Sequence, residues 1–134
     1  MPVPKMTLEL AEFFPYQFSI VAQQMSEYIA QIYRKQYGLT RYEWRVLATV
    51  AQHKNICAKE IMQFTRLDKM QVSRAIAKLK QENWLNQETD QQDRRANEVT
   101  LTKKGQAQYQ EIVPLVQQQE QQMLAGLSGA EQQQ

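Results

Sequence analysis

The chain has 134 residues, of which 43% are hydrophobic and 22% are charged, and a formal net charge of +2. This size and balance predict one ordinary soluble domain with a modest core, and no apolar run approaches the roughly 20 residues of a membrane span. One cysteine excludes an internal disulfide, and the first residues lack the apolar core of a secretory signal, so we expect a cytoplasmic protein.

Positive charge gathers in the middle of the chain. Residues 54–104 hold eleven Lys or Arg against seven Asp or Glu, whereas the remainder holds five against seven. Between Lys69 and Lys80 there are four cations and no anion. A local positive field of this kind suits a polyanion such as nucleic acid, although a solvated helix face gives the same pattern.

The first part of the sequence predicts two helices. Apolar side chains recur at spacings of four and three over residues 12–36, which indicates a long amphipathic helix with a seam for packing on another helix. Gly38 is a stop signal for this helix. Thr40 opens the next one, with Glu43 as its capping-box partner. The buried stripe of this second helix is expected to hold Trp44, Leu47 and Val50.

A helix-turn-helix pattern follows. A short third helix is expected after Cys57, which stands where a cap oxygen would normally sit, and residues 65–67 form a break. Asp68 is a good N-cap for a fourth helix that reaches Asn83, with Gln71 at the capping-box position. The buried face of the fourth helix is expected to hold Val72, Ala75, Ile76 and Leu79.

The other face of the fourth helix carries the residues expected to reach DNA. Such a helix offers short polar and cationic side chains to base edges, where Gln pairs with adenine and Arg with guanine, and a Met can contact a thymine methyl group. Lysines further along the helix meet phosphates. The candidates on this helix are Lys69, Met70, Gln71, Ser73, Arg74 and Lys78, which would otherwise be merely solvent-facing.

A hairpin comes next. After Asn83 the period of the pattern becomes two, so residues 84–89 and 98–102 are expected to pair as antiparallel strands. The polar turn between them ends in Asp93, Arg94 and Arg95. An Arg guanidinium fits the narrow, negative minor groove, and Asp93 is placed to pair with Arg95 and hold the tip. A surface salt bridge without function is the alternative.

The last part of the sequence is rich in Gln and predicts a helix over about residues 103–124, capped by Thr102. Pro114 is expected to kink this helix and Gly126 to end it. Residues 128–131 spell a further capping box, yet the sequence stops at residue 134, so we expect the last helix to be truncated.

Several runs of residues together carry a family resemblance. They are residues 42–47, 58–61, 68–74 and 90–95, completed by Leu101, Thr102 and Gly105. These runs resemble those of the multiple-antibiotic-resistance regulators, the MarR family of bacterial transcription factors. The likeness extends from Phe13 to Ser128, and its most specific part is the Asp-Arg-Arg tip followed by Leu-Thr and Gly.

The resemblance implies a single, mainly α-helical domain over residues 1–134. A winged helix-turn-helix lobe with a two-stranded β-wing would occupy residues 39–104, and residues 8–38 and 105–134 would form dimerisation helices. It further implies a homodimer that reads a palindromic site in double-stranded DNA, usually as a repressor. Asp93 with Arg95, and Ser73 with Arg74, are the wing and recognition-helix residues that match the family's motif.

Many members of this family release DNA when a small aromatic or amphipathic effector binds. In this sequence a cleft for such a molecule could be lined by residues of the first two helices. The candidates are Phe13, Tyr16, Tyr42, Trp44 and Arg45. Aromatic residues at helical spacing also form cores, so the sequence leaves both interpretations open.

Other functions remain as alternatives. Cys57 at a helix N-terminus could make the protein a redox-responsive regulator, since the helix dipole favours thiolates there. A winged helix can also serve as a protein-interaction module. Catalysis lacks support, because His53 is the only imidazole and no glycine-rich phosphate loop is present. One His and one Cys cannot close a transition-metal site, so we expect no metal, no catalytic residues and no cofactor.

Overall fold

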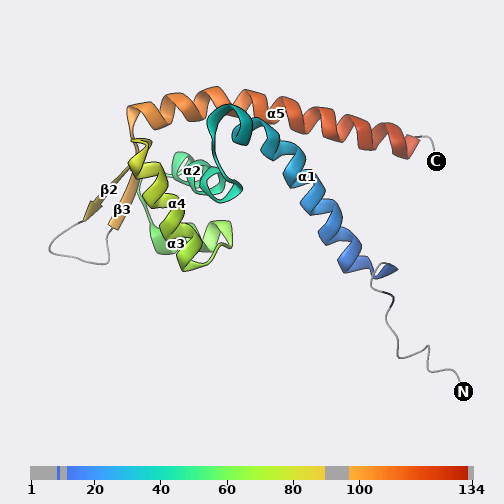
Figure 1. Ribbon diagram of the computed structural model, residues 1–134, viewed down its shortest axis with the longest axis horizontal. Helices are drawn as coiled ribbons and strands as arrows, with labels where there is room; N and C mark the ends of the chain where they lie inside the picture. Colours follow the sequence, from blue (N-terminus) through green and yellow to red (C-terminus); the bar gives the residue numbers. More distant parts are fainter. Residues whose placement is uncertain (1–8, 10–11, 90–96, 133–134) are drawn as a thin grey trace, which may run out of the picture.

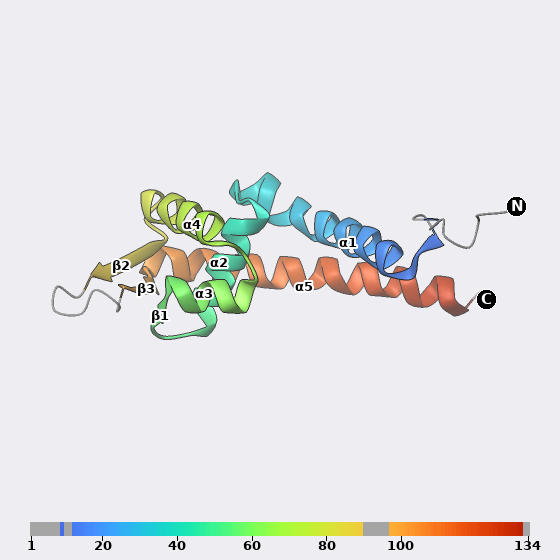
Figure 2. The ribbon, with the colours of Figure 1, turned by 90° about the horizontal axis from the view of Figure 1, so that it is seen from below.

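The computed structural model describes residues 9, 12–89 and 97–132, and over these it contains five helices and one small antiparallel sheet. A lobe formed by α2 to β3 lies at one end of a long α5 (Figures 1 and 2). Both α1 and α5 extend away from this lobe, and they diverge in the view of Figure 1. The expected mainly helical, winged fold is confirmed. The elements are α1 (Phe14–Tyr37), α2 (Arg41–Gln52), β1 (Ile56–Cys57), α3 (Ala58–Thr65), α4 (Lys69–Gln81), β2 (Leu85–Thr89), β3 (Asn97–Leu101) and α5 (Lys103–Gln132).

The helix boundaries follow the capping signals of the sequence. Gly38 ends α1 in the left-handed conformation, with φ at 67°, which a residue without Cβ adopts freely. The Thr40 hydroxyl accepts the Glu43 N–H at 3.2 Å at the start of α2. At the start of α4 the Asp68 carboxylate accepts the Gln71 N–H at 2.8 Å. These three predicted boundaries are confirmed, because each depends on contacts between near neighbours in the chain.

The core of the lobe lies where α2, α3 and α4 meet the sheet. Leu47, Ile61 and Leu79 are fully buried there, and Val99 of β3 closes the core from the sheet side. A stack of aromatic rings links this lobe to the long helices. Trp44 of α2 lies between Tyr33 of α1 and Tyr109 of α5, with ring centroids 5.5 and 5.8 Å away. The lobe is therefore fixed to α1 and α5 by packing as well as by the chain.

The sheet has three strands, in the order β1-β3-β2, where the sequence predicted two. β2 and β3 pair antiparallel, with Leu85 opposite Leu101, as the wing prediction required. β1 was not predicted. It adds Ile56 opposite Val99 on the other side of β3. A strand of two residues is too short to show an alternating pattern, so only the fold reveals it.

A junction of backbone and hydroxyl groups joins α4, the wing and α5. The Thr102 hydroxyl donates to the Asn83 carbonyl at 2.6 Å, and the Thr102 N–H donates to the Trp84 carbonyl at 3.1 Å. The Gly105 N–H donates to the Thr102 hydroxyl at 2.9 Å, which confirms the predicted cap of α5. A Cβ on Gly105 would collide with the Trp84 carbonyl, so this approach requires glycine.

The predicted end of the last helix at Gly126 is wrong. α5 continues through Gly126 to Gln132, and Ser128 therefore starts no separate helix. A glycine inside a helix costs about 1 kcal/mol relative to alanine, which does not force the helix to end. The chain also passes through Pro114 without leaving the helix. Among the described residues, no helix is long and apolar enough to cross a membrane.

Candidate nucleic-acid interface

The helix α4 separates its apolar and polar residues onto two faces. Val72, Ile76 and Leu79 are buried against the lobe. The opposite face is exposed to solvent and carries five of the residues predicted to reach DNA, while Gln71 is half-buried beside them. The exposed five are Lys69, Met70, Ser73, Arg74 and Lys78.

The cations on this face differ in how far they are already engaged. Lys78 lies 3.6 Å from the Glu82 carboxylate in an exposed pair, which contributes little to stability. Lys80 donates to Gln87 of β2 at 3.3 Å and so links the recognition helix to the wing. In the part of the chain that the structure describes, neither Lys69 nor Arg74 forms an ion pair. Their charges remain available to an anionic partner.

The wing is described up to its last paired residues. β2 and β3 remain paired as far as Thr89 opposite Asn97, beside the C-terminal end of α4. The predicted wing residues Asp93, Arg94 and Arg95 lie outside the described residues. The structure therefore provides the base of the wing, and the role of its tip stays a prediction from the sequence.

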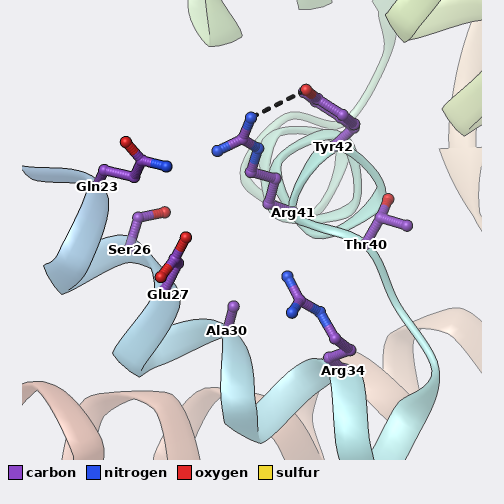
Figure 3. Close-up of a pocket in the computed structure, with 8 residues that line it drawn as sticks. All are labelled: Gln23, Ser26, Glu27, Ala30, Arg34, Thr40, Arg41 and Tyr42. Atoms are coloured by element: carbon purple, nitrogen blue, oxygen red, sulfur yellow. Dashed lines mark hydrogen bonds between the residues drawn. The ribbon is translucent and has the colours of Figure 1, made fainter.

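A hollow of about 450 Å³ lies between α1 and the start of α2, and we call it the α1–α2 hollow (Figure 3). Two guanidinium groups, of Arg34 and Arg41, line it together with one carboxylate, that of Glu27. Arg41 donates to the Tyr42 hydroxyl at 3.0 Å and lies 5.0 Å from the centre of that ring. This hydrogen bond raises the pKa of Arg41 above its ordinary value, so the group stays charged.

A second hollow, of about 400 Å³, lies between α2 and α4, and we call it the α2–α4 hollow. Tyr42 and Thr40 line both hollows, so these two residues separate one from the other. On the side of α4 the second hollow is lined by Gln71 and Arg74. The start of α2 thus lies directly beside the half of α4 that was predicted to reach base edges.

The structure does not bring the predicted effector residues together. Arg45 and Trp44 line a third hollow, of about 240 Å³, with residues of α1 and α5, whereas Tyr42 lines the other two. Tyr16 and Phe13 lie at the far start of α1, with 37% and 43% of their surface exposed. Trp44 belongs to the aromatic stack, which supports the alternative that it is a core residue.

Sequence reasoning missed Arg34 and Arg41 as lining residues of a hollow. They lie seven positions apart on two helices, and each looked like an ordinary surface cation. The turn at Gly38 brings the end of α1 back against the start of α2, so both guanidinium groups reach one hollow. The sequence did contain a signal for this hollow, since an Arg and a Tyr stand next to each other at the predicted start of the second helix.

Cys57 and His53 have local partners. The Cys57 N–H and its thiol both donate to the Glu60 carboxylate, at 3.3 and 3.2 Å, and this thiol bond lowers the pKa of Glu60. The thiol is thus engaged in a local hydrogen bond at the start of α3. His53 bonds the Thr49 carbonyl at 2.7 Å and packs on Phe64, as suits a residue at a helix end. We therefore propose no redox role.

Comparison with known sequences agrees with this geometry. A sequence model described as the MarR family matches residues 37–96, which span α2 to α4 and β2. The winged-helix region thus resembles the MarR family, and transcriptional regulators of that family are among the solved structures of similar fold. No curated protein sequence matches this chain significantly.

Solved structures extend the similarity beyond the matched region. BpsR of Bordetella bronchiseptica, described through the regulation of its DNA binding by 6-hydroxynicotinic acid, has a TM-score of 0.79 and 26% identity over 94% of this chain and 89% of its own. A MarR/EmrR family regulator from Acinetobacter sp. ADP1 has a TM-score of 0.78 and 22% identity over 94% and 89%. MarR of E. coli has a TM-score of 0.72 and 18% identity over 90% of this chain and 96% of its own. The long helices of this chain thus belong to the fold that these structures share.

Proposed function

We propose that this chain is a repressor that binds a palindromic operator as a homodimer and releases it when a small anionic effector binds. The observation that carries the proposal is the amphipathic α4. Its exposed face holds polar side chains and two cations, Lys69 and Arg74, that form no ion pair among the described residues, and the wing base lies beside it. A helix of this kind reads base edges in the major groove, while a wing Arg enters the minor groove.

The dimer is supported by the exposed face of α1. Large apolar side chains recur there at spacings of four and three, and they remain exposed although Phe14 and Phe18 contact each other. Monomers rarely expose a contiguous apolar patch of this kind, and a second copy would cover it. The patch contains Phe14 (66% exposed), Phe18 (60%) and Val21 (44%), with Leu124 of α5 at 48%.

The effector site is supported by the α1–α2 hollow. Its two guanidinium groups suit a carboxylate, since Arg forms paired hydrogen bonds with that group, and the Tyr42 ring offers a planar surface. The hollow lies between the diverging α1 and the lobe, where an occupant would influence their relative position. The similarity to BpsR, whose DNA binding is regulated by 6-hydroxynicotinic acid, supports the same class of ligand.

Selection of bound sequences from a random pool of duplex DNA tests the DNA-binding part. We expect an inverted repeat whose half-sites lie about one helical turn apart. Arg74→Ala should lose about 1–3 kcal/mol of binding and relax the preference at one position of each half-site, as should Arg95→Ala at the flanks. Enrichment of no sequence at all would overturn the proposal.

A reporter assay tests repression, and a ligand titration tests effector binding. A promoter that carries the selected site should be repressed by the protein and released by the effector. 6-Hydroxynicotinate and benzoate serve as first probes, and we expect one of them to raise the melting temperature of wild-type protein but not of Arg34→Gln. Arg66→Gln is a matched control, because this cation lies at the end of α3 and lines neither hollow. Equal shifts in all three proteins would count against the hollow.

A further inference from the structure

The α2–α4 hollow joins the start of α2 to the recognition helix and belongs to none of the contacts assigned so far. Gln71 and Arg74 line it from α4, and Thr40, Tyr42 and Glu43 line it from α2. A helix in the major groove has phosphodiester backbone on both sides. A hollow beside the half of α4 that enters the groove therefore lies where one of these backbones would run.

The charge around this hollow favours an anion. Arg74 forms no ion pair among the described residues, so its positive charge is not neutralised and adds to the field beside the hollow. Glu43 is the one acidic residue in the lining, and it is nearly buried, with 9% of its surface exposed. Its carboxylate is occupied by the hydroxyl and the N–H of Thr40, at 2.9 and 3.4 Å. Arg41 lines the neighbouring α1–α2 hollow, and its hydrogen bond to the Tyr42 hydroxyl places a second cation next to this site.

Tyr42 supplies an unused donor at the same place. A phenol oxygen accepts hydrogen bonds and carries one O–H of its own. The oxygen of Tyr42 accepts from Arg41 at 3.0 Å, and no described residue accepts its O–H. A phenol that accepts a bond from a cation is polarised and becomes a stronger donor. The Tyr42 O–H beside Arg74 is thus a site for an anionic oxygen.

We propose that the Tyr42 hydroxyl and the Arg41 guanidinium bind the phosphodiester backbone next to the groove that α4 enters, as a contact independent of DNA sequence. This inference rests on the proposed DNA binding and adds α2 to its surface. The contact would fix the position of α4 in the groove, because a contact to the DNA backbone sets the orientation of a protein without reading bases. It makes Tyr42 and Arg41 contributors to affinity on any duplex.

Two substitutions and their controls test the contact. Tyr42→Phe keeps the ring and removes the donor, and we expect about tenfold weaker binding of both the selected duplex and an unrelated duplex. Arg41→Gln should weaken both and lower the slope of log affinity against log salt by about 0.9 per subunit. The controls are Tyr28→Phe and Lys35→Gln, which remove a hydroxyl and a cation from α1, outside both hollows.

Fluorescence anisotropy over a salt series, with melting temperatures to verify folding, separates the outcomes. Binding by both variants within twofold of wild type, with an unchanged slope, would overturn the inference and leave the proposed function standing. A loss confined to the selected duplex would also overturn it, because the residues would then read bases. Stabilisation of the wild type by orthophosphate, with no effect of Tyr42→Phe on DNA, would assign the hollow to a free anion instead. A wild-type protein that binds no DNA would defeat the proposed function itself.

Discussion

The winged lobe and the start of α1 contain similar apolar side chains, but the lobe buries them and the start of α1 exposes them. Leu47 in the lobe is fully buried, whereas Phe18 on α1 has 60% of its surface exposed. The lobe closes its own core with contacts among three helices and a sheet. The start of α1 diverges from α5 and leaves its apolar face open (Figure 1). One region is completed by its own chain, and the other is the surface that we propose a second copy covers.

The largest effect is expected from a cavity in the lobe. Leu47→Ala should lower the free energy of unfolding by about 3 kcal/mol, because a fully buried leucine loses its packing and leaves a void. Urea denaturation followed by circular dichroism measures this change. Leu47→Met, which keeps the volume, should cost less than about 1.5 kcal/mol. Equal losses for both variants would show that volume at this position does not matter.

A somewhat smaller loss is expected where the lobe joins α5. Gly105→Ala should cost about 2 kcal/mol, because the added Cβ collides with the Trp84 carbonyl, which belongs to the backbone and cannot move aside. Gly126→Ala is the matched control in the same helix, since its Cβ meets nothing within 4 Å, and it should stabilise the helix slightly. Equal melting temperatures for the two variants would show that the backbone at Trp84 can move to accept a Cβ at position 105.

On the open region the expected effect is on association. Phe18→Asp should raise the dissociation constant of the proposed dimer at least about tenfold, because one buried aromatic side chain is worth roughly 1.5–3 kcal/mol. Sedimentation velocity over a concentration series measures it. Phe64→Asp is the control, since Phe64 is 61% exposed but lies on the lobe, and it should leave association unchanged. An effect of Phe64→Asp as large as that of Phe18→Asp would move the interface to the lobe.

The smallest effect is expected at the cap of α3. Cys57→Ser should raise the free energy of unfolding by about 0.5 kcal/mol, because a hydroxyl caps a helix better than a thiol does. Thermal melting measures the change. We also expect mild peroxide to leave the DNA affinity of the wild type unaltered, since the thiol is bonded to Glu60. Loss of affinity on oxidation in the wild type but not in Cys57→Ser would revive the redox alternative.

The parts of the fold that the sequence predicted are those with local causes. Gly38, Thr40 and Asp68 mark helix boundaries through contacts with neighbours three to four residues away, so these boundaries can be recognised in the sequence alone. The two faces of α4 follow in the same way from helical periodicity. β1 could not be predicted, because Ile56 pairs with Val99, far along the chain.

The hollows show a second reason for failure. The sequence placed Tyr16 and Tyr42 among the residues that could line one cleft between the first two helices. A helix rises about 1.5 Å per residue, so Tyr16 lies roughly 30 Å from the turn. Arg34 lies one helical turn from Gly38 and does reach the hollow. Residue type suggested a cleft correctly, but distance along the helix decides which side chains can line it.

The lobe is attached to the long helices at two short passages, one at Gly38 and one at Thr102. Bending at these two passages, against the packing of Trp44 on Tyr33 and Tyr109, would turn the lobe about the line that joins them. In the proposed dimer, such a rotation would change the separation of the two lobes. A small molecule bound near that line would therefore change the distance between the two lobes along a duplex by more than the width of the molecule itself.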